Sequence, residues 1–79
     1  MRFKYGYAFS VYKKSHIRMA EQAIKGKINR TKNQIAELYS PWKSAYDEAN
    51  NEDDAKNKVR KRYPASDYYL RLEKRKDLK

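Results

Sequence analysis

The first eleven residues alternate strictly between two kinds of side chain. Apolar or aromatic residues occupy the odd positions as far as Val11, and small, polar or charged residues occupy the even positions. A period of two is typical of a strand with one buried face. A helix is the alternative, because Phe3, Tyr7 and Val11 also recur every four residues. Gly6 and the aromatic density favour the strand, which we expect over residues 2–12.

A strand over residues 2–12 requires a partner, because buried backbone N–H and C=O groups without hydrogen bonds cost free energy. We interpret residues 68–73, where apolar and polar side chains alternate again, as the only candidate. We therefore expect either that both segments are strands that pair, which would bring the termini together, or that neither is one. A last helix capped by Ser66 is the alternative for the tail.

The middle of the chain changes to a helical period. From Ile17 to Leu38, apolar residues and Thr31 recur at steps of three and four and form one continuous seam. The seam predicts a long helix over about residues 15–39. Gly26 lies opposite the seam and should cost that helix about 1 kcal/mol relative to alanine.

Two shorter helices are predicted to follow. Ser40 and Pro41 are a helix start signal, which predicts a helix over about residues 41–50. The helical spacing also continues across Pro41, so a single helix kinked there is the alternative. A third helix is predicted over about residues 51–62, because acidic residues fill its first turn and basic residues its last. Pro64 ends it.

These elements predict a mostly α fold with a small two-stranded β element, in the α+β class. An all-α domain of three or four helices is the alternative. With 79 residues we expect one small domain, 1–79, with adjacent termini. The chain has no cysteine, so disulfides and thiolate metal sites cannot stabilise it.

One short stretch resembles a known RNA-binding signature. The run Gly6-Tyr7-Ala8-Phe9, with Tyr12 three residues later, is similar to the RNP1 sequence of RNA-recognition motifs, in which aromatics stack on bases. In that family RNP1 lies on the third strand, whereas here only a few residues precede it. We therefore favour an alternating strand whose odd-numbered aromatics cover a small core.

The sequence offers little from which to build a catalytic site. His16 is the only histidine, and no cluster of histidines and carboxylates has the spacing of metal ligands. The serines have no candidate base that could activate them. We therefore expect a protein that is not an enzyme and that carries no cofactor or metal.

The formal net charge of +10 predicts an anionic partner. Nucleic acid, DNA or RNA, held through its phosphates with weak sequence preference, is the main hypothesis. An acidic surface of another protein is the alternative, with the chain acting as an adaptor or inhibitor, including one encoded by a phage. A subunit of a ribonucleoprotein or other assembly is the third hypothesis.

No apolar run reaches the length of a membrane span, so we expect a soluble intracellular protein, in the cytoplasm or the nucleoid or nucleus.

Three groups of residues are candidates for contact with nucleic acid or an acidic partner. Four cations form a stripe along the predicted long helix, although any polar helix face in a lysine-rich chain would gather lysines. They are Lys14, Arg18, Lys25 and Lys32. A second basic cluster follows in the third helix, at Lys56, Lys58, Arg60, Lys61 and Arg62. Tyr12 and Tyr69 are the aromatics expected to remain exposed and available for stacking on bases.

Overall fold

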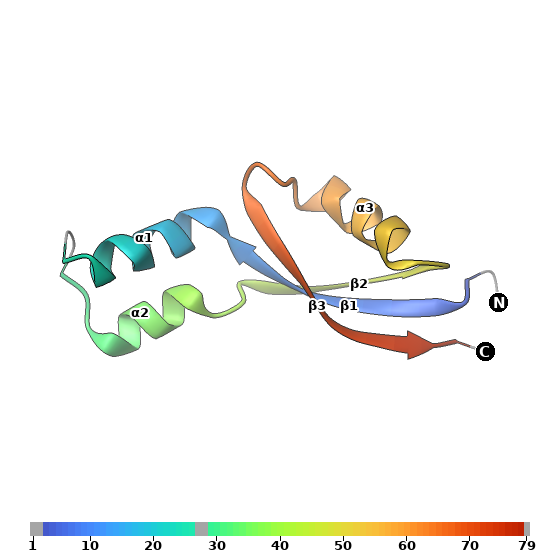
Figure 1. The fold of residues 1–79 in the computed structure, drawn as a ribbon, viewed down its shortest axis with the longest axis horizontal. Coiled ribbons are helices and arrows are strands. Elements are labelled where there is room, and N and C mark those ends of the chain that lie inside the picture. The colour runs from blue at the N-terminus through green and yellow to red at the C-terminus, as the bar shows by residue number, and fades with distance from the viewer. Residues whose placement is uncertain (1–2, 27–28, 79) are drawn as a thin grey trace.

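The computed structural model describes residues 3–26 and 29–78. Strands and helices follow one another along an elongated molecule with principal extents of 50 × 22 × 14 Å (Figure 1). In chain order they are β1 (Tyr5–Lys13), α1 (Lys14–Ile24), α2 (Lys32–Tyr39), β2 (Lys43–Ala49), α3 (Glu52–Arg62) and β3 (Tyr68–Asp77).

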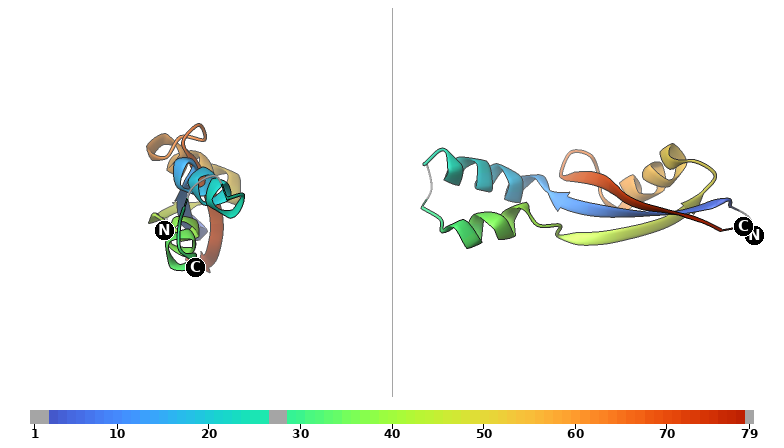
Figure 2. Two further views of the ribbon diagram at one scale, coloured as in Figure 1. Left: turned by 90° about the vertical axis from the view of Figure 1, so that its left-hand side faces the viewer. Right: turned by 60° about the horizontal axis from the view of Figure 1, so that its bottom comes forward.

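The strands form one antiparallel sheet in the order β2-β1-β3, so β1 is central. Its register places Tyr5 opposite Ala49 of β2, and Lys13 opposite Tyr68 of β3. The expected pairing between residues 2–12 and 68–73 is therefore present. Next to the strands, the backbone N–H of Leu78 donates to the Lys4 carbonyl at 2.9 Å, and Figure 2 shows the start of β1 beside the end of β3.

The core lies between α3 and one face of the sheet. The odd-numbered residues of β1 point into it, with Tyr7, Phe9 and Val11 only 3%, 1% and 0% exposed. Burial raises the pKa of Tyr7 above its ordinary value. The base-stacking role that the RNP1 resemblance implies for Tyr7 and Phe9 is excluded by this burial. The other buried members of the cluster are Ala45, Ala49, Ala55 and Val59.

The predicted fold class is wrong, because the described residues form a three-stranded sheet with three helices rather than a mostly α fold with two strands. Residues 41–50 contain β2 where a helix was expected. Ala45 and Ala49 are four residues apart, a spacing that places both on one face of a helix. The same spacing also places both on one face of a strand, because strand side chains alternate with a period of two. Pairing with β1 decides for the strand, and the two small side chains let α3 approach the sheet closely. The all-α alternative is wrong for the same reason.

The single helix over residues 15–39 is also wrong, because the seam folds back on itself as two helices, the α1–α2 hairpin. Gly26, at φ +79°, adopts the left-handed conformation just after α1 ends. Thr31 starts α2 with a capping box, its side chain accepting from the Gln34 backbone N–H while the Gln34 side chain accepts from that of Thr31. Ser40 ends α2 instead of starting a helix, and its hydroxyl donates to the Ala36 carbonyl at 3.0 Å. The kink at Pro41 is therefore absent too.

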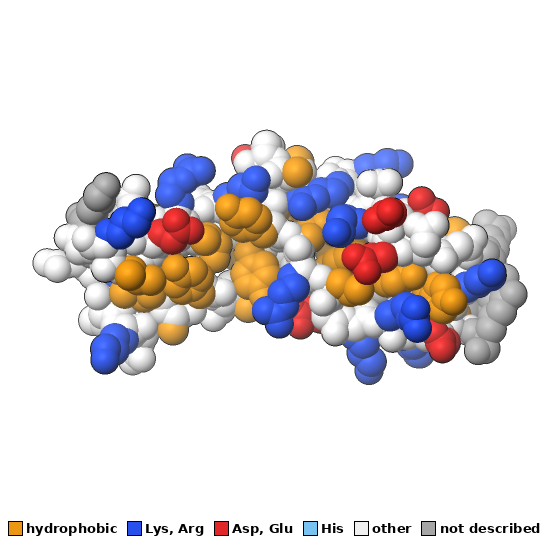
Figure 3. All heavy atoms as spheres, viewed as in Figure 1, with side chains coloured by type: hydrophobic (Ala, Val, Ile, Leu, Met, Phe, Trp, Pro, Cys, Tyr) orange, Lys and Arg blue, Asp and Glu red, His pale blue; other side chains and the backbone are white. Residues whose placement is uncertain are grey.

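The α1–α2 hairpin projects beyond one end of the sheet (Figures 1 and 2). Ala20 is its one buried residue among those described. Hydrophobic side chains consequently reach the surface along the hairpin (Figure 3), where Ile24 is 62% and Tyr39 40% exposed. Its internal packing is thin, so α3 and the sheet carry most of the core.

The helix expected over 51–62 is observed as α3. Asn51 caps it, with its side-chain oxygen accepting from the Asp54 backbone N–H at 2.8 Å. Glu52 and Lys56, one turn apart on this helix, form an ion pair at 3.8 Å. Because α3 supplies the helical half of the core, its cap contributes to the stability of the whole fold.

Replacing the cap tests this role of α3. Asn51→Ala should lower the free energy of unfolding by about 1 kcal/mol, since it removes the capping acceptor. Asn57→Ala is the matched control, because Asn57 is exposed within the same helix and alanine is the better helix former there. Urea unfolding followed by circular dichroism measures both. Equal losses in the two variants would contradict the capping role.

Candidate nucleic-acid interface

The sheet has a second face, which the described helices leave uncovered. Side chains alternate between the two faces of a strand, so the even-numbered residues of β1 point away from the core. Their cross-strand partners share this face, which we call the open face. Its members are Gly6, Ala8, Ser10 and Tyr12 on β1, Ser44, Tyr46 and Glu48 on β2, and Tyr69, Arg71, Lys74 and Lys76 on β3.

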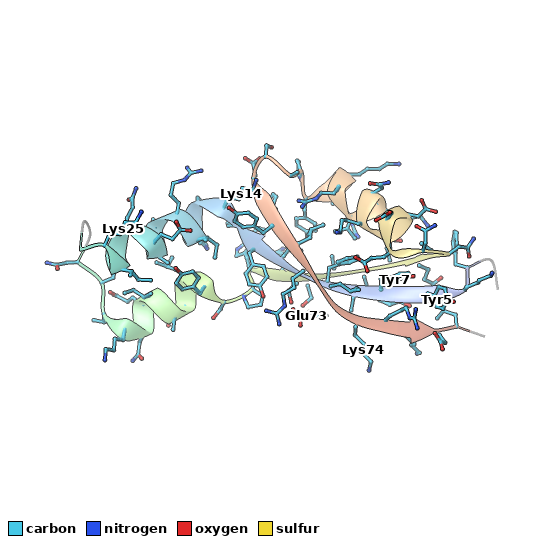
Figure 4. The ribbon with its side chains drawn as sticks, viewed as in Figure 1. Tyr5, Tyr7, Lys14, Lys25, Glu73 and Lys74 are labelled. Carbon is cyan, nitrogen blue, oxygen red and sulfur yellow. The ribbon has the colours of Figure 1, made fainter. Side chains whose placement is uncertain are left out.

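A bulge in β3 sets which charges lie on the open face. The register places Leu72 opposite Phe9 and Lys74 opposite Ala8, so Glu73 is the extra residue. The shift turns Lys74 and Lys76 to the face that Tyr69 and Arg71 already occupy. Figure 4 shows Lys74 pointing away from the body of the protein. Glu73 forms an ion pair with Arg71, at 2.8 Å between carboxylate oxygen and Nε.

Tyr12 and Tyr69, both predicted as exposed aromatics, lie directly opposite each other on neighbouring strands. Tyr69 is 48% exposed and Tyr12 is half-buried. The ammonium group of Lys14 lies 4.9 Å from the centre of the Tyr69 ring. Two aromatic rings and a cation predicted from separate segments are thus brought together at one end of the open face.

Tyr46 is an open-face residue that sequence reasoning missed, because residues 41–50 were assigned to a helix. Its ring lies over Gly6, where any Cβ would collide with it. Partial burial, followed by the charge and hydrogen bond of Glu48, raises the pKa of Tyr46 above its ordinary value. The available signal was Gly6 itself, since a glycine inside a strand often marks a close approach by another group.

The four cations predicted as one stripe do not form one. Lys14 and Arg18 belong to α1, Lys25 follows its last residue, and Lys32 begins α2. Figure 4 shows Lys14 beside the sheet and Lys25 at the far end of the hairpin. The stripe depended on a continuous helix, and the turn at Gly26 separates its two halves.

Lys14 and Arg18 instead border a small hollow where α1 leaves the sheet. The hollow has a volume of about 260 Å³. Its other lining residues are Lys13, Ser15, Ser66, Asp67 and Tyr68. The Lys14 backbone N–H donates across it to the Asp67 carbonyl at 3.0 Å, which fixes α1 against the loop before β3.

Most of the predicted α3 cluster is engaged within the protein. Lys56 pairs with Glu52, and Arg62 lies 3.5 Å from an Asp47 carboxylate oxygen. The Lys58 ammonium donates to the Glu48 carbonyl at 2.6 Å and lies 3.9 Å from the Phe3 ring centre. Arg60 donates to the Tyr68 carbonyl at 2.8 Å. Lys61 is exposed. The cluster therefore mainly stabilises the packing of α3 on the sheet, and few of its cations are available to a ligand.

Trp42, at the junction of α2 and β2, is a second aromatic position that the sequence assignment placed in a helix. It stacks on Tyr68, with ring centres 5.9 Å apart. The ammonium groups of Lys13 and Lys43 lie 4.0 and 5.0 Å from the Trp42 ring. Tyr68 packs against the core, so this cluster belongs to the α3 side of the sheet.

Residues 3–26 and 29–78 contain no group of three or more histidines and carboxylates able to hold a metal ion. In the same ranges, none of the helices combines the length and apolar character needed to cross a membrane. Comparison with known proteins gives no match, whether to a family model, a curated protein or a solved structure.

The structural role of Arg60 can be separated from its charge. Arg60→Ala should lower the free energy of unfolding by about 1–2 kcal/mol, because the carbonyls of Tyr63 and Tyr68 lose a charged donor. Lys61→Ala removes the same charge from an exposed neighbour and should change stability by less than about 0.5 kcal/mol. Chemical denaturation of both variants measures the difference, and equal effects would contradict the assignment.

The contact between Gly6 and Tyr46 predicts non-additive effects. Gly6→Ala should destabilise the wild type, because the new methyl group displaces the Tyr46 ring. In a Tyr46→Ala background the same change should be neutral or stabilise by about 0.4–1 kcal/mol, since alanine restricts the unfolded chain. A double-mutant cycle should give a coupling of about 0.5–3 kcal/mol. Additive effects would show that Tyr46 does not lie over Gly6 in solution.

Proposed function

We propose that this protein binds nucleic acid through its open face. The observation that carries the proposal is the joint presence of tyrosines and cations on one sheet face that the described helices leave uncovered. Nucleic acids supply both a phosphate chain for the cations and flat bases for the rings. The formal net charge of +10 supports association with such a polyanion.

The cations of the open face follow one strand. Arg71, Lys74 and Lys76 project from β3 on the same side as Tyr69. Lys74 and Lys76 are two residues apart, a separation of about 6–7 Å along a strand. A row of this kind suits a phosphate backbone that runs along β3, and Lys14 extends it at the Tyr69 end.

The acidic residues of the region only partly offset this charge. Glu73 is already paired with Arg71, and Glu48 lies near the Tyr46 hydroxyl, on the strand farthest from β3. The side chains that reach solvent are mostly lysines, arginines and tyrosines rather than amides. Contacts of this type hold phosphates and base faces and read base edges poorly, so we expect weak sequence preference. An intracellular, soluble protein without catalytic activity is part of the proposal.

A second candidate function, docking on an acidic protein surface, has its own supporting observation. In the described sheet β3 pairs only with β1, so its other edge is available to an added strand. Beside it, a hollow of about 500 Å³ on the core side is bordered by Tyr5, Tyr7, Leu72 and Arg75, among others. Tyr5 and Tyr7 lie together at this end of the sheet (Figure 4). An extended acidic peptide would suit that edge.

Charge reversal on the open face and on the α1–α2 hairpin distinguishes binding at the open face from an effect of net charge alone. Lys74→Glu with Lys76→Glu should lower affinity for a labelled oligonucleotide at least tenfold. It should also reduce the slope of log affinity against log salt by about 1.4, for two phosphate contacts at about 0.7 each. Fluorescence anisotropy over a salt series measures both quantities.

Lys25→Glu with Lys32→Glu is the matched control, because it changes the net charge equally at the far end of the α1–α2 hairpin. It should keep most of the affinity. If both double variants lose affinity equally, binding follows net charge and the open-face proposal is wrong. If the wild type binds neither DNA nor RNA at low salt, nucleic acid is not the ligand.

A further inference from the structure

We infer that the open face takes single-stranded rather than double-stranded nucleic acid, and that bases stack on Tyr12 and Tyr69. The inference rests on the proposed function and adds the class of nucleic acid and the way its bases are held. It depends on the placement of the two rings, the shape of the face and the contact that Lys14 makes.

The two tyrosines lie side by side on neighbouring strands at one end of the open face. They are direct cross-strand partners, so their β carbons lie about 4.5–5.5 Å apart and their side chains leave the sheet on the same side. A strand that lies along β3, with its phosphates near Lys74 and Lys76, would bring its next bases to these rings. Stacking is available to every base, which fits a protein without edge-reading side chains at this position.

The central strand places only small side chains next to these rings. Gly6, Ala8 and Ser10 are the open-face residues of β1 before Tyr12, and all three are small. Larger side chains flank them, with Tyr46 on β2 and the cations on β3. The Tyr46 ring covers Gly6 and Ser10 is only 8% exposed, so β1 itself projects little beyond its neighbours until Tyr12. A flexible single strand can follow this surface and turn its bases onto the rings.

Duplex nucleic acid fits the same surface poorly. Its bases are already stacked on one another, so their faces are closed to tyrosine unless the duplex is opened at a cost of a few kcal/mol per step. Reading a duplex groove requires a helix or a strand pair that enters it. Among the described helices α3 packs on the core face, and the α1–α2 hairpin lies beyond one end of the sheet (Figures 1 and 2). The open face itself therefore carries no such projection.

The Lys14 ammonium lies over the face of the Tyr69 ring on which a base would stack. The free energies of the two contacts decide whether the ammonium or the base occupies that face. A cation–π contact at an exposed site contributes about 0.5–1 kcal/mol, whereas base stacking on an aromatic contributes about 1–3 kcal/mol. The base therefore displaces the Lys14 ammonium from Tyr69. The displaced ammonium remains within reach of the neighbouring phosphate, so its charge continues to favour the complex.

The test uses three labelled ligands with equal phosphate numbers per strand: a mixed-sequence single strand, the same strand with abasic sites at its central positions, and the duplex. For the wild type, the intact strand should bind about 5- to 150-fold more tightly than the abasic strand for each base stacked. It should also bind more tightly than the duplex. Tyr69→Ala should remove most of the difference between intact and abasic strands without changing the salt slope.

Two further variants keep the test decisive. Tyr39→Ala is the control, because Tyr39 is an exposed tyrosine on α2, outside the open face, and it should leave the intact-to-abasic ratio unchanged. Tyr69→Trp preserves an aromatic surface and should retain or raise affinity, which separates stacking from loss of fold. Circular dichroism of each variant confirms that the sheet is formed.

Each outcome has a distinct meaning. Equal affinity for the intact and abasic strands would overturn stacking on the tyrosines. Duplex binding as tight as single-strand binding would overturn the single-strand preference while leaving the proposed function in place. Absence of binding to all three ligands at low salt would overturn the proposed function itself, and this inference with it.

Discussion

The fold depends on the pairing of β1 along both of its edges. β1 is the one described strand with a neighbour on each side, and its odd-numbered side chains provide Tyr7, Phe9 and Val11 to the core. A single strand between residues 5 and 13 thus fixes where β2, β3 and α3 must lie. Because β3 comes from the other end of the sequence, the core forms only when distant segments meet. Pairing of these distant segments therefore gives a chain with few large apolar residues a single hydrophobic core.

The same pairing creates the surface to which we assign function. With α3 packed on one face, a three-stranded sheet must expose the other. On that face β1 contributes small residues and Tyr12, β2 contributes Tyr46, and β3 contributes Tyr69 with a row of cations. The residues that stabilise the protein and those proposed to bind its ligand therefore alternate along the same strands. Two cations of α3 have a structural rather than a proposed binding role. Lys58 and Arg60 donate hydrogen bonds to backbone carbonyls of the sheet and its connections.

Much of this arrangement follows from local patterns, and the rest follows from contacts between distant segments. The alternation in β1, its pairing with the tail, the inward aromatics and the helix at 52–62 were all predictable from the sequence. β2 was not predictable, because the spacing of Ala45 and Ala49 fits both a helix face and a strand face. Only pairing with the edge of β1 decides for the strand. The α1–α2 hairpin carried signals that the continuous seam concealed, namely Gly26 and the Thr31–Gln34 capping box. Within the site, Tyr12 and Tyr69 were expected to be exposed, and Tyr69 is exposed whereas Tyr12 is half-buried. The roles of Tyr46 and Lys74 depend on β2 and on the bulge at Glu73, which no local pattern revealed.

The most direct test of the account is a residue-by-residue map of where nucleic acid touches the protein. Titrating ¹⁵N-labelled protein with a short single strand and following the backbone amide signals by NMR provides that map. The account predicts the largest shifts along β3 from Tyr69 to Lys76, at Tyr12 and in the first turn of α1, and small shifts in α3 and at the tip of the α1–α2 hairpin. Shifts concentrated in α3 or the hairpin, with β3 unchanged, would contradict the assignment of the open face as the binding surface.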